Sequence, residues 1–324
     1  MSLLPALGID VAKKTFQAAL RLDQKKRSKS FTNDAAGFAA LREWLAKQGV
    51  ARVHVCLEAT GSYSDNLARY LHTQQHTVSL VNPARIKAHG QSRLIRTKND
   101  QVDATLIAHF CEEARPAAWT PPPPEIVELQ ALVRHLDSLG DVRQQLRNRL
   151  TDGPQVKLVR DSLGTTIEQL ETAMAAVEKQ IMEQLERYPD LDSKATVIDS
   201  ITGISRLTAA KLLGEMPQLG NYKRAAQAVA FAGLNPLEHQ SGTSIKTKPR
   251  LSKAGNARLR KILYFPAISA LRHNPVIKQL GERLRARGLC EMAIIGAAMR
   301  KLVHLIFGVV KTGKTFDANH ACAT

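Results

Sequence analysis

Cysteine and aromatic residues are scarce in this chain of 324 residues. Its four cysteines, Cys56, Cys111, Cys290 and Cys322, lie far apart and form no CxxC pair, which disfavours a zinc knuckle and a disulfide framework. Aromatic residues make up 5% of the sequence, so recognition of nucleic acid by stacking bases on aromatic side chains is not indicated. The cysteine usage is typical of a protein in a reducing compartment.

The sequence also lacks the signature of a secretory signal and an uninterrupted membrane-spanning run. The N-terminal segment carries the carboxylate of Asp10 and has no basic lead or small-residue cleavage site. The most apolar stretch, Met292 to Val310, is interrupted by Arg300, Lys301 and His304, so we expect a buried pair of helices there. These features predict a cytoplasmic protein that does not contact a membrane.

Acidic residues are outnumbered by basic ones. The chain has 46 Lys and Arg against 29 Asp and Glu, a formal net charge of +17. The excess is regional, because the segment from Ser241 to the C-terminus holds 16 Lys and Arg and only 3 acidic residues. A generic solvated surface would mix the two signs, so the pattern predicts a polyanionic partner.

The first third of the chain predicts an α/β domain. Elements in the order βββαβαβα are expected at residues 6–12, 15–22, 27–32, 34–49, 52–59, 64–75, 77–82 and 99–114. Asn33 is expected to cap the first helix, and the continuous apolar run at 52–59 is typical of a buried strand. This order indicates a mixed sheet flanked by helices, the ribonuclease-H-like arrangement among others.

Proline and helical periodicity predict the organisation of the remaining chain. Pro121 to Pro124 interrupt regular structure and mark a boundary. Apolar residues then recur at three- and four-residue steps over 126–150 and 163–185, which predicts either an antiparallel helical hairpin or a dimerising coiled coil. Residues 198–216 predict two helices joined by a tight glycine turn, either a phosphate-binding helix-hairpin-helix or a plain αα-corner.

These signals divide the chain into three parts. Residues 1–118 form the α/β domain, 119–190 a Pro-rich linker with a coiled-coil helical hairpin, and 191–324 a mainly α C-terminal domain.

Four carboxylates in the first part have the arrangement that a metal site requires. Asp10 and Glu58 lie at the ends of predicted strands, and Asp100 and Asp103 share one face of a predicted helix. Hard Mg²⁺ ions prefer such oxygen ligands and assist phosphodiester chemistry, with Mn²⁺ as an alternative. Local roles remain open, because Asp100 has capping-box spacing from Thr97 and Asp10 could close a turn. Glu58 is harder to explain structurally, because a carboxylate in an apolar strand is costly unless it is paired.

Several segments together resemble a known family. They are LGIDVAKKTF, CLEATGSY, VNPARIKAHGQS and RTKNDQVDATLIAHF in the first half, and SITGISRLTAAKLLGEM, AFAGLNPLEHQSG and LSKAGNARLRKILY in the second. Nearly the whole chain resembles the DEDD transposases of bacterial insertion sequences, which are relatives of the pilin-gene invertases. The resemblance implies a RuvC-like nuclease fold in which Asp10, Glu58, Asp100 and Asp103 bind the metal. It also implies that Ser241 is a nucleophile, that a structured non-coding RNA guides the enzyme, and that subunits share a composite site.

The serine can be considered on chemical grounds as well. A serine that attacks a DNA phosphate conserves bond energy in a phosphoserine ester, so strands can be rejoined without ATP. Ser241-Gly242 is also a common turn sequence, and Thr243 and Ser244 are rival nucleophiles. Residues suited to contact phosphates follow it, namely Lys246, Lys248, Arg250, Lys253, Arg258, Arg260 and Lys261.

The sequence therefore predicts an insertion-sequence transposase: an Mg²⁺-dependent, RNA-guided DNA recombinase that uses Ser241. Its expected partners are donor and target double-stranded DNA, a guide RNA and further copies of itself in a dimer or tetramer, at the bacterial nucleoid when bound to DNA. One alternative is a RuvC-like nuclease or junction resolvase that uses only the four acids. The other is an inactive nucleic-acid-binding protein in which the basic region alone has a function.

Overall fold

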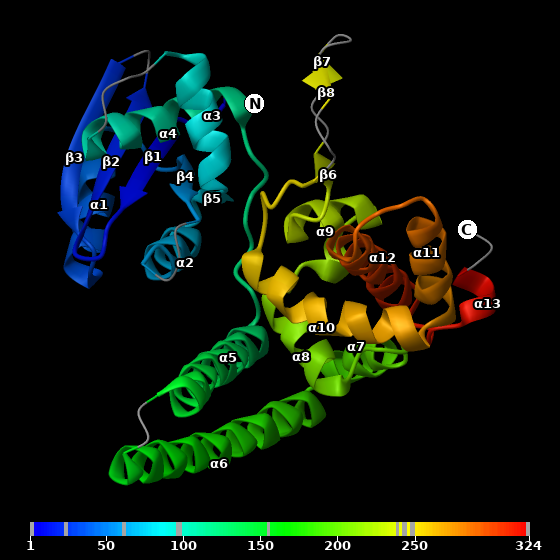
Figure 1. The fold of residues 1–324 in the computed structure, drawn as a ribbon. Coiled ribbons are helices and arrows are strands. Elements are labelled where there is room, and N and C mark those ends of the chain that lie inside the picture. Colours follow the sequence, from blue (N-terminus) through cyan, green and yellow to red (C-terminus); the bar gives the residue numbers. More distant parts are fainter. Residues whose placement is uncertain are drawn as a thin grey trace. The chain divides into compact units, whose positions relative to one another are not determined.

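The chain folds into two compact units, Met1–Pro121 and Pro122–Thr324 (Figure 1). The computed structural model describes residues 3–22, 25–59, 63–94, 99–153, 156–237, 240–241, 245–246 and 250–321. The described N-terminal elements are β1 (Ala6–Val11), β2 (Thr15–Leu22), β3 (Lys25–Thr32), α1 (Ala35–Lys47), β4 (His54–Glu58), α2 (Asp65–Thr73), β5 (Thr77–Val81), α3 (Pro83–Ser92) and α4 (Asp100–Ala114).

The N-terminal unit is built on a mixed sheet with the strand order β3-β2-β1-β4-β5. The first three strands form an antiparallel meander, and β4 and β5 continue the sheet parallel to β1. The predicted meander and mixed sheet are thus confirmed, and the order is compatible with a RuvC-like domain.

The two faces of this sheet have different cores. Because successive side chains of a strand point to opposite faces, Leu7, Ile9, Val55 and Leu57 pack on the side of α1 and α2. Ala6 and Cys56 face the other way and pack against residues of α3 and α4, which include Ile86, Ile107 and Phe110. The burial of both faces explains why β1 and β4 read as nearly continuous apolar runs.

Helix α4 lies on the sheet at backbone contact. A Cβ atom added to Gly8 of β1 would come within 2.1 Å of the Ala108 nitrogen and 2.3 Å of the Ala104 oxygen. Ala104, Ala108 and Ala19 form a small buried cluster at this contact. Only glycine on the strand and alanine on the helix permit so close an approach.

The prediction that Asn33 caps α1 is wrong by one residue. Asp34 is the cap, and its carboxylate accepts a 2.8 Å hydrogen bond from the Gly37 backbone N–H, which holds the pKa of Asp34 below its usual value. The Asn33 amide instead donates to the backbone oxygens of Ala12 and Tyr63, at 3.1 and 3.0 Å. Asn33 therefore joins the turn after β1 to the segment before α2.

The C-terminal unit is mainly helical. Its described elements are α5 (Pro124–Asp152), α6 (Lys157–Arg187), α7 (Pro189–Asp199), α8 (Arg206–Glu215), the 3₁₀ helix η1 (Leu219–Asn221), α9 (Ala225–Ala232), β6 (Pro236–Leu237), β7 (Gln240–Ser241), β8 (Ile245–Lys246), β9 (Arg250–Leu251), α10 (Ala257–His273), α11 (Pro275–Ala286), α12 (Glu291–Thr312) and α13 (Ala318–Ala321).

Helices α5 and α6 pair with each other within one chain (Figure 1). Gln184 donates a 2.8 Å hydrogen bond to Glu128 near one end of the pair, and Arg147 forms an ion pair with Glu171 nearer the other. The order of these contacts makes the hairpin antiparallel. Of the two arrangements that the periodicity allowed, the intramolecular hairpin is present, and dimerisation through these helices stays a prediction.

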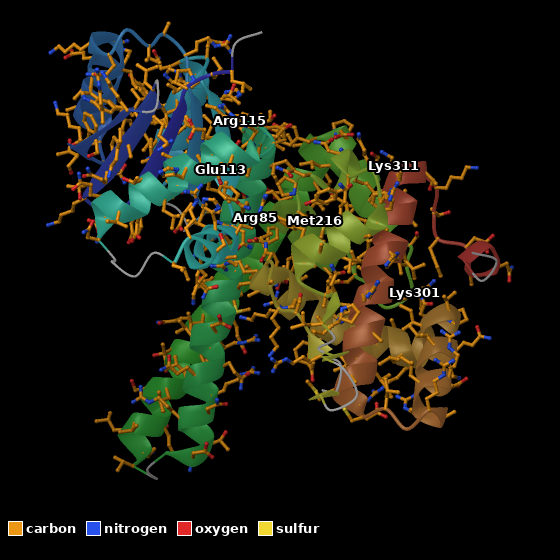
Figure 2. All side chains as sticks on the ribbon, turned by 90° about the horizontal axis from the view of Figure 1, so that it is seen from above. Arg85, Glu113, Arg115, Met216, Lys301 and Lys311 are labelled. Atoms are coloured by element: carbon orange, nitrogen blue, oxygen red, sulfur yellow. The ribbon has the colours of Figure 1, made fainter. Side chains whose placement is uncertain are left out.

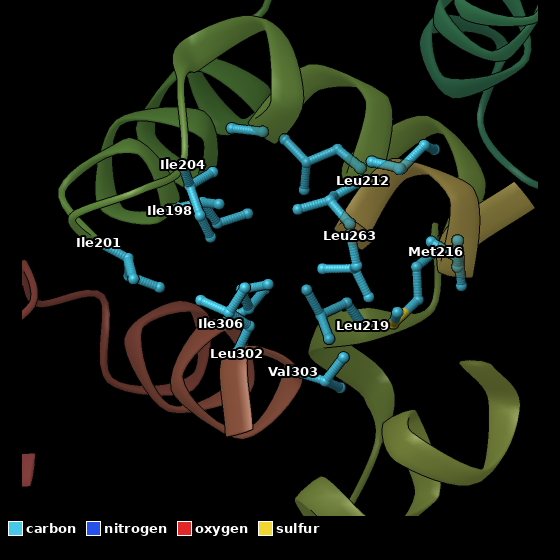
Figure 3. Close-up of a cluster of buried hydrophobic side chains, with 14 of the residues drawn as sticks. Ile198, Ile201, Ile204, Leu212, Met216, Leu219, Leu263, Leu302, Val303 and Ile306 are labelled. Atoms are coloured by element: carbon cyan, nitrogen blue, oxygen red, sulfur yellow. The ribbon is translucent and has the colours of Figure 1, made fainter. Parts of the chain in front are cut away.

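The other helices enclose one hydrophobic core. Figure 3 shows Ile198, Ile204, Leu212, Leu263 and Leu302 among its members, contributed by α7, the turn after it, α8, α10 and α12. In that turn Gly203 has φ +104° and lies against the Ala270 backbone, and Ser205 accepts a 3.3 Å hydrogen bond from the Thr208 N–H. These contacts favour the αα-corner interpretation, because the helix start is capped and packed by the protein itself.

The prediction of a helix pair over Met292 to Val310 is wrong, because the segment belongs to the single helix α12 of 22 residues. Arg300, Lys301 and His304 are half-buried, whereas Leu302 and Ile306 on the other side of the helix are buried in the core. Among the described helices, α12 is the one long and apolar enough to cross a membrane, and half of that apolar window is buried inside the protein. The charged residues mark one face of a continuous helix rather than a break.

The Gly8 contact can be tested by adding a single methyl group. We expect Gly8→Ala to destabilise the N-terminal unit by about 1–3 kcal/mol, because α4 must move away from β1. Both tryptophans of the chain, Trp44 and Trp119, belong to this unit, so tryptophan fluorescence in urea monitors its unfolding. Gly164→Ala in α6, where the added Cβ meets nothing within 4 Å, should leave this transition unchanged. An unchanged midpoint in Gly8→Ala would contradict the packing.

Candidate active site

Asp10 and Glu58 occupy equivalent positions on adjacent parallel strands. Ile9 of β1 pairs with Leu57 of β4, and the two acidic residues come directly after this pair. Since Ile9 and Leu57 point into the core beneath α1 and α2, Asp10 and Glu58 project from the opposite face of the sheet, which α4 covers. Both carboxylates are half-buried, at the carboxyl end of the strands.

Helix α4 directs its own acids toward the same edge. At its C-terminal end the Arg115 guanidinium donates to the Leu4 oxygen at 2.7 Å, and the Cys111 thiol donates to the His54 oxygen at 3.2 Å. Both acceptors lie where β1 and β4 begin, and Figure 2 labels Arg115 at this end. The helix therefore runs antiparallel to these strands, and its N-terminus lies toward the edge that carries Asp10 and Glu58.

Asp100 and Asp103 lie in the first turn of α4. Asn99 caps the helix and accepts a 2.8 Å hydrogen bond from the Val102 N–H, whereas Thr97, whose spacing from Asp100 suggested a capping box, lies outside the described residues. Asp103 is half-buried and Asp100 is exposed. The positive end of the helix dipole stabilises carboxylates in this turn. The turn that carries Asp100 and Asp103 thus lies toward the edge of the sheet where Asp10 and Glu58 stand.

The four carboxylates suit a hard divalent cation, because each offers oxygen ligands. The four carboxylates do not form a close cluster. Among the described residues, a group of three potential ligand atoms within 4.8 Å of one another is found elsewhere, at His54, Cys56 and Cys111. The acids line the edge and do not form a closed shell around a single point. Such an edge fits a site that a metal ion and a phosphate complete together.

Ser241 lies in a β-hairpin arm of the C-terminal unit (Figure 1). At the base of the arm, Pro236 and Leu237 of β6 pair with β9, and further out Ser241 of β7 pairs with Ile245 of β8. Thr243, Ser244 and Lys248 lie outside the described residues. The backbone arrangement puts Ser241 in the outer strand pair of a two-stranded arm.

The arm is joined to the helices by two glycines in close contact. Gly233 ends α9 with φ +70°, and a Cβ on Gly255 would lie 2.5 Å from the Gly233 nitrogen. Arg260 of α10 donates hydrogen bonds from one guanidinium nitrogen to the backbone oxygens of Ala232 and Gly255, at 3.0 and 3.2 Å. These bonds hold together the two chain segments that enter and leave the arm.

A buried carboxylate, Glu215, forms hydrogen bonds next to the base of the hairpin arm. The Glu215 side chain, 1% exposed, accepts hydrogen bonds at 2.7 and 3.3 Å from Arg134 of α5. It also accepts a 3.2 Å hydrogen bond from Asn256, the residue that caps α10 through the Arg258 and Leu259 N–H groups. A buried charge is tolerated only with such partners. Sequence patterns did not indicate this network, although Asn256 stands where a helix cap is common.

The predicted phosphate-contacting residues differ in their surroundings. Arg250, Lys253 and Arg258 are exposed. Arg260 is engaged with the backbone oxygens at the base of the arm, and Lys261 forms an ion pair with Asp141 of α5. The structure thus gives Arg260 a role inside the protein that its basic sequence context did not indicate. Lys246 is described by its backbone alone, within β8.

Comparisons with known proteins agree with this architecture. One family model, described as a transposase of the DEDD group, matches residues 7–153, and a second, described as the transposase IS116/IS110/IS902 family, matches 195–282. The pilin gene-inverting proteins of Moraxella bovis and Moraxella lacunata are 30% identical over 314 residues, covering 96% of this chain and 97% of their own length. The transposase for insertion sequence element IS1111A of Coxiella burnetii is 24% identical over 306 residues, 82% of this chain and 78% of its own length.

Together, the mixed sheet with its acidic edge and the matches along the chain define a DNA-modifying enzyme of the transposase class. The chain belongs to the IS110 family of insertion-sequence transposases. The resemblance noted in the sequence is thereby confirmed, and DNA binding and a dependence on a divalent metal follow from membership.

The exposed basic residues predict a measurable salt dependence of DNA binding. Replacing Arg250 and Arg258 together by alanine should lower the slope of log affinity against log salt by about two units, because about 0.9 counterions are released per phosphate contact. Fluorescence anisotropy with unrelated duplexes would measure it. Lys194→Ala removes a cation that is paired with Asp190 on its own helix and should leave the slope unchanged. Equal slopes in all three proteins would remove the two arginines from the DNA surface.

Proposed function

We propose that this transposase cuts and rejoins DNA strands through a covalent phosphoserine intermediate formed on Ser241. The observation that carries the proposal is the placement of Asp10, Glu58, Asp100 and Asp103 toward one edge of the sheet, since strand cleavage needs a cation that offsets the phosphate charge and carboxylates can hold one. The family assignment supports a DNA substrate.

The four carboxylates would hold Mg²⁺, or Mn²⁺ in its place. When bound, the cation supplies charge stabilisation to the phosphodiester and to the oxygen that leaves. The residues of the chain set where this happens: Asp10 and Glu58 are fixed by the pairing of β1 with β4, and Asp103 by the contact of α4 with Gly8. A rigid sheet edge keeps their oxygens oriented before the DNA arrives.

Ser241 would make the covalent bond. Its hydroxyl gives up its proton and forms an Oγ–P bond, while a P–O bond of the DNA breaks and the departing hydroxyl takes up a proton. The hydroxyl of a second strand then attacks the phosphoserine, restores a phosphodiester and releases the serine with its proton. The number of phosphoester bonds is constant, so the cycle needs no ATP.

The acids and the serine belong to different compact units, and we propose that the functional site is assembled from more than one subunit. A dimer or tetramer would bring the acidic edge of one copy to the hairpin arm of another, with two DNA sites held together. The basic C-terminal segment would contact both DNA and a structured RNA from the element that selects the sites. A charge of +17 is compatible with both nucleic acids.

The role of Glu58 can be tested by a change that preserves its shape. We expect Glu58→Gln to keep the fold and lose metal-dependent strand cleavage by on the order of 10²-fold or more, because a neutral amide replaces a charged oxygen ligand. Cleavage of a labelled DNA at several Mg²⁺ concentrations measures the effect. The matched control is Glu43→Gln, because Glu43 is exposed on α1, which packs on the face of the sheet opposite to the acids. Wild-type cleavage by Glu58→Gln would exclude this residue from the metal site.

The covalent step distinguishes recombination from hydrolysis. Ser241→Ala should bind DNA normally yet lose strand exchange by on the order of 10⁴-fold or more, since a nucleophile has no substitute. Wild-type protein trapped on a nicked substrate should give a denaturant-resistant adduct that peptide mapping assigns to Ser241. Ser138→Ala in α5 controls for loss of a hydroxyl elsewhere. An adduct on Thr243 or Ser244 would move the nucleophile, and free hydrolysed ends without an adduct would favour the nuclease alternative.

A further inference from the structure

The N-terminal unit contains a second cluster of metal-binding side chains, separate from the acidic edge. His54, Cys56 and Cys111 each offer a ligand atom, and the three atoms lie within 4.8 Å of one another. The cysteines are 0% exposed and the histidine 6%. The proposed function gives these residues no task.

The fold brings the three side chains together in a simple way. His54 and Cys56 are two residues apart on β4, so they point to the same face of the sheet, the face covered by α4. Cys111 lies on the α4 surface that meets this strand, where its thiol donates to the His54 backbone oxygen at 3.2 Å. One strand and one helix thus supply two sulfurs and one imidazole to a common point.

The hydrogen bond between His54 and Ser79 determines which imidazole nitrogen of His54 can bind a metal ion. Ser79 of β5 lies with its hydroxyl oxygen 2.9 Å from His54 Nε2 and 3.0 and 2.9 Å from the backbone oxygens of Pro116 and Ala117. Backbone oxygens only accept, so the single hydroxyl proton of Ser79 is directed to them, and Ser79 accepts from Nε2–H. In the neutral imidazole the lone pair then lies on Nδ1. Histidines that bind metals usually have their other nitrogen anchored in this manner.

We propose that His54 Nδ1 and the sulfurs of Cys56 and Cys111 bind one thiophilic metal ion, Zn²⁺ or Cu⁺. Two sulfurs with one imidazole prefer soft or borderline ions, whereas Mg²⁺ and Mn²⁺ prefer the oxygen ligands of the acidic edge. On binding, each thiol forms a metal–sulfur bond and releases its proton to the solvent, two protons for each ion.

This ion would have a structural effect on the unit. It would join β4, which ends at Glu58, to α4, which begins at Asp100, through metal–ligand bonds in addition to the Cys111–His54 hydrogen bond and the apolar contacts. Cys56 lies two residues before Glu58 on the same face of the strand. Metal binding at the buried cluster would therefore stabilise the packing of the two elements that carry three of the four acids.

Cadmium is a direct spectroscopic probe of such a site. The purified full-length protein, reduced and stripped of metal, is titrated with Cd²⁺ in excess Mg²⁺, which keeps the carboxylates occupied by the harder ion. We expect one equivalent to produce a thiolate-to-metal charge-transfer band in the ultraviolet and to raise the unfolding temperature reported by tryptophan fluorescence. Cys111→Ser and His54→Gln should weaken Cd²⁺ binding at least 10-fold. Cys290→Ser, which alters an exposed cysteine of the other unit, is the matched control and should keep the band.

Parallel titrations with Zn²⁺ and, under reducing anaerobic conditions, with Cu⁺ identify the preferred ion by competition against Cd²⁺. Either ion displacing Cd²⁺ at one equivalent supports the proposal. A wild-type protein that shows no thiolate band at stoichiometric Cd²⁺ overturns it, without reference to any variant. Loss of the band in Cys290→Ser, or a full band in folded Cys111→Ser, would also overturn it, and the three residues would then be a hydrogen-bonded part of the core only.

Discussion

The close contact between α4 and β1 at Gly8 is the constraint on which the N-terminal site depends. A helix that approaches a strand until its Ala104 and Ala108 backbone touches glycine has a single register, because a side chain of any size at these positions would separate the two elements. Because this contact fixes the register, it also fixes the position of the first turn of α4 along β1. The turn with Asp100 and Asp103 then lies toward the edge that carries Asp10 near the end of β1 and Glu58 at the end of β4.

A comparable constraint supports the hairpin arm of the C-terminal unit. Glu215 is a buried carboxylate whose partners, Arg134 and Asn256, come from helices distant in the sequence. Removing Arg134 would leave the buried carboxylate with only the Asn256 amide as a partner, a cost of about 3–5 kcal/mol. The Arg260 hydrogen bonds and the Gly233–Gly255 contact join the two chain segments at the base of the arm. The hairpin arm that carries Ser241 is thus joined to the helical core at a specific point.

The sheet combines two classes of ligand on one face. Oxygen donors lie at its carboxyl edge, and the sulfur and nitrogen donors of Cys56, Cys111 and His54 lie deeper, beneath α4. Hard and soft ligands select different ions, so the two proposed sites would not compete for the same metal. The alternation of side chains along β4 lets this one strand contribute to both groups, since His54, Cys56 and Glu58 share a face.

The sequence alone determined the mixed sheet, the basic C-terminal segment and the family, because periodicity, charge and motifs are local in the chain, but the predicted element order omitted α3 between β5 and α4. Only the tertiary structure decided that α5 and α6 pair within one chain, that residues 291–312 form one helix, and that Asp34 caps α1. It also showed that Arg260 donates hydrogen bonds to the backbone of the protein, and it brought His54 and Cys56 together with Cys111. These outcomes depend on contacts between residues far apart in sequence, which local patterns do not encode.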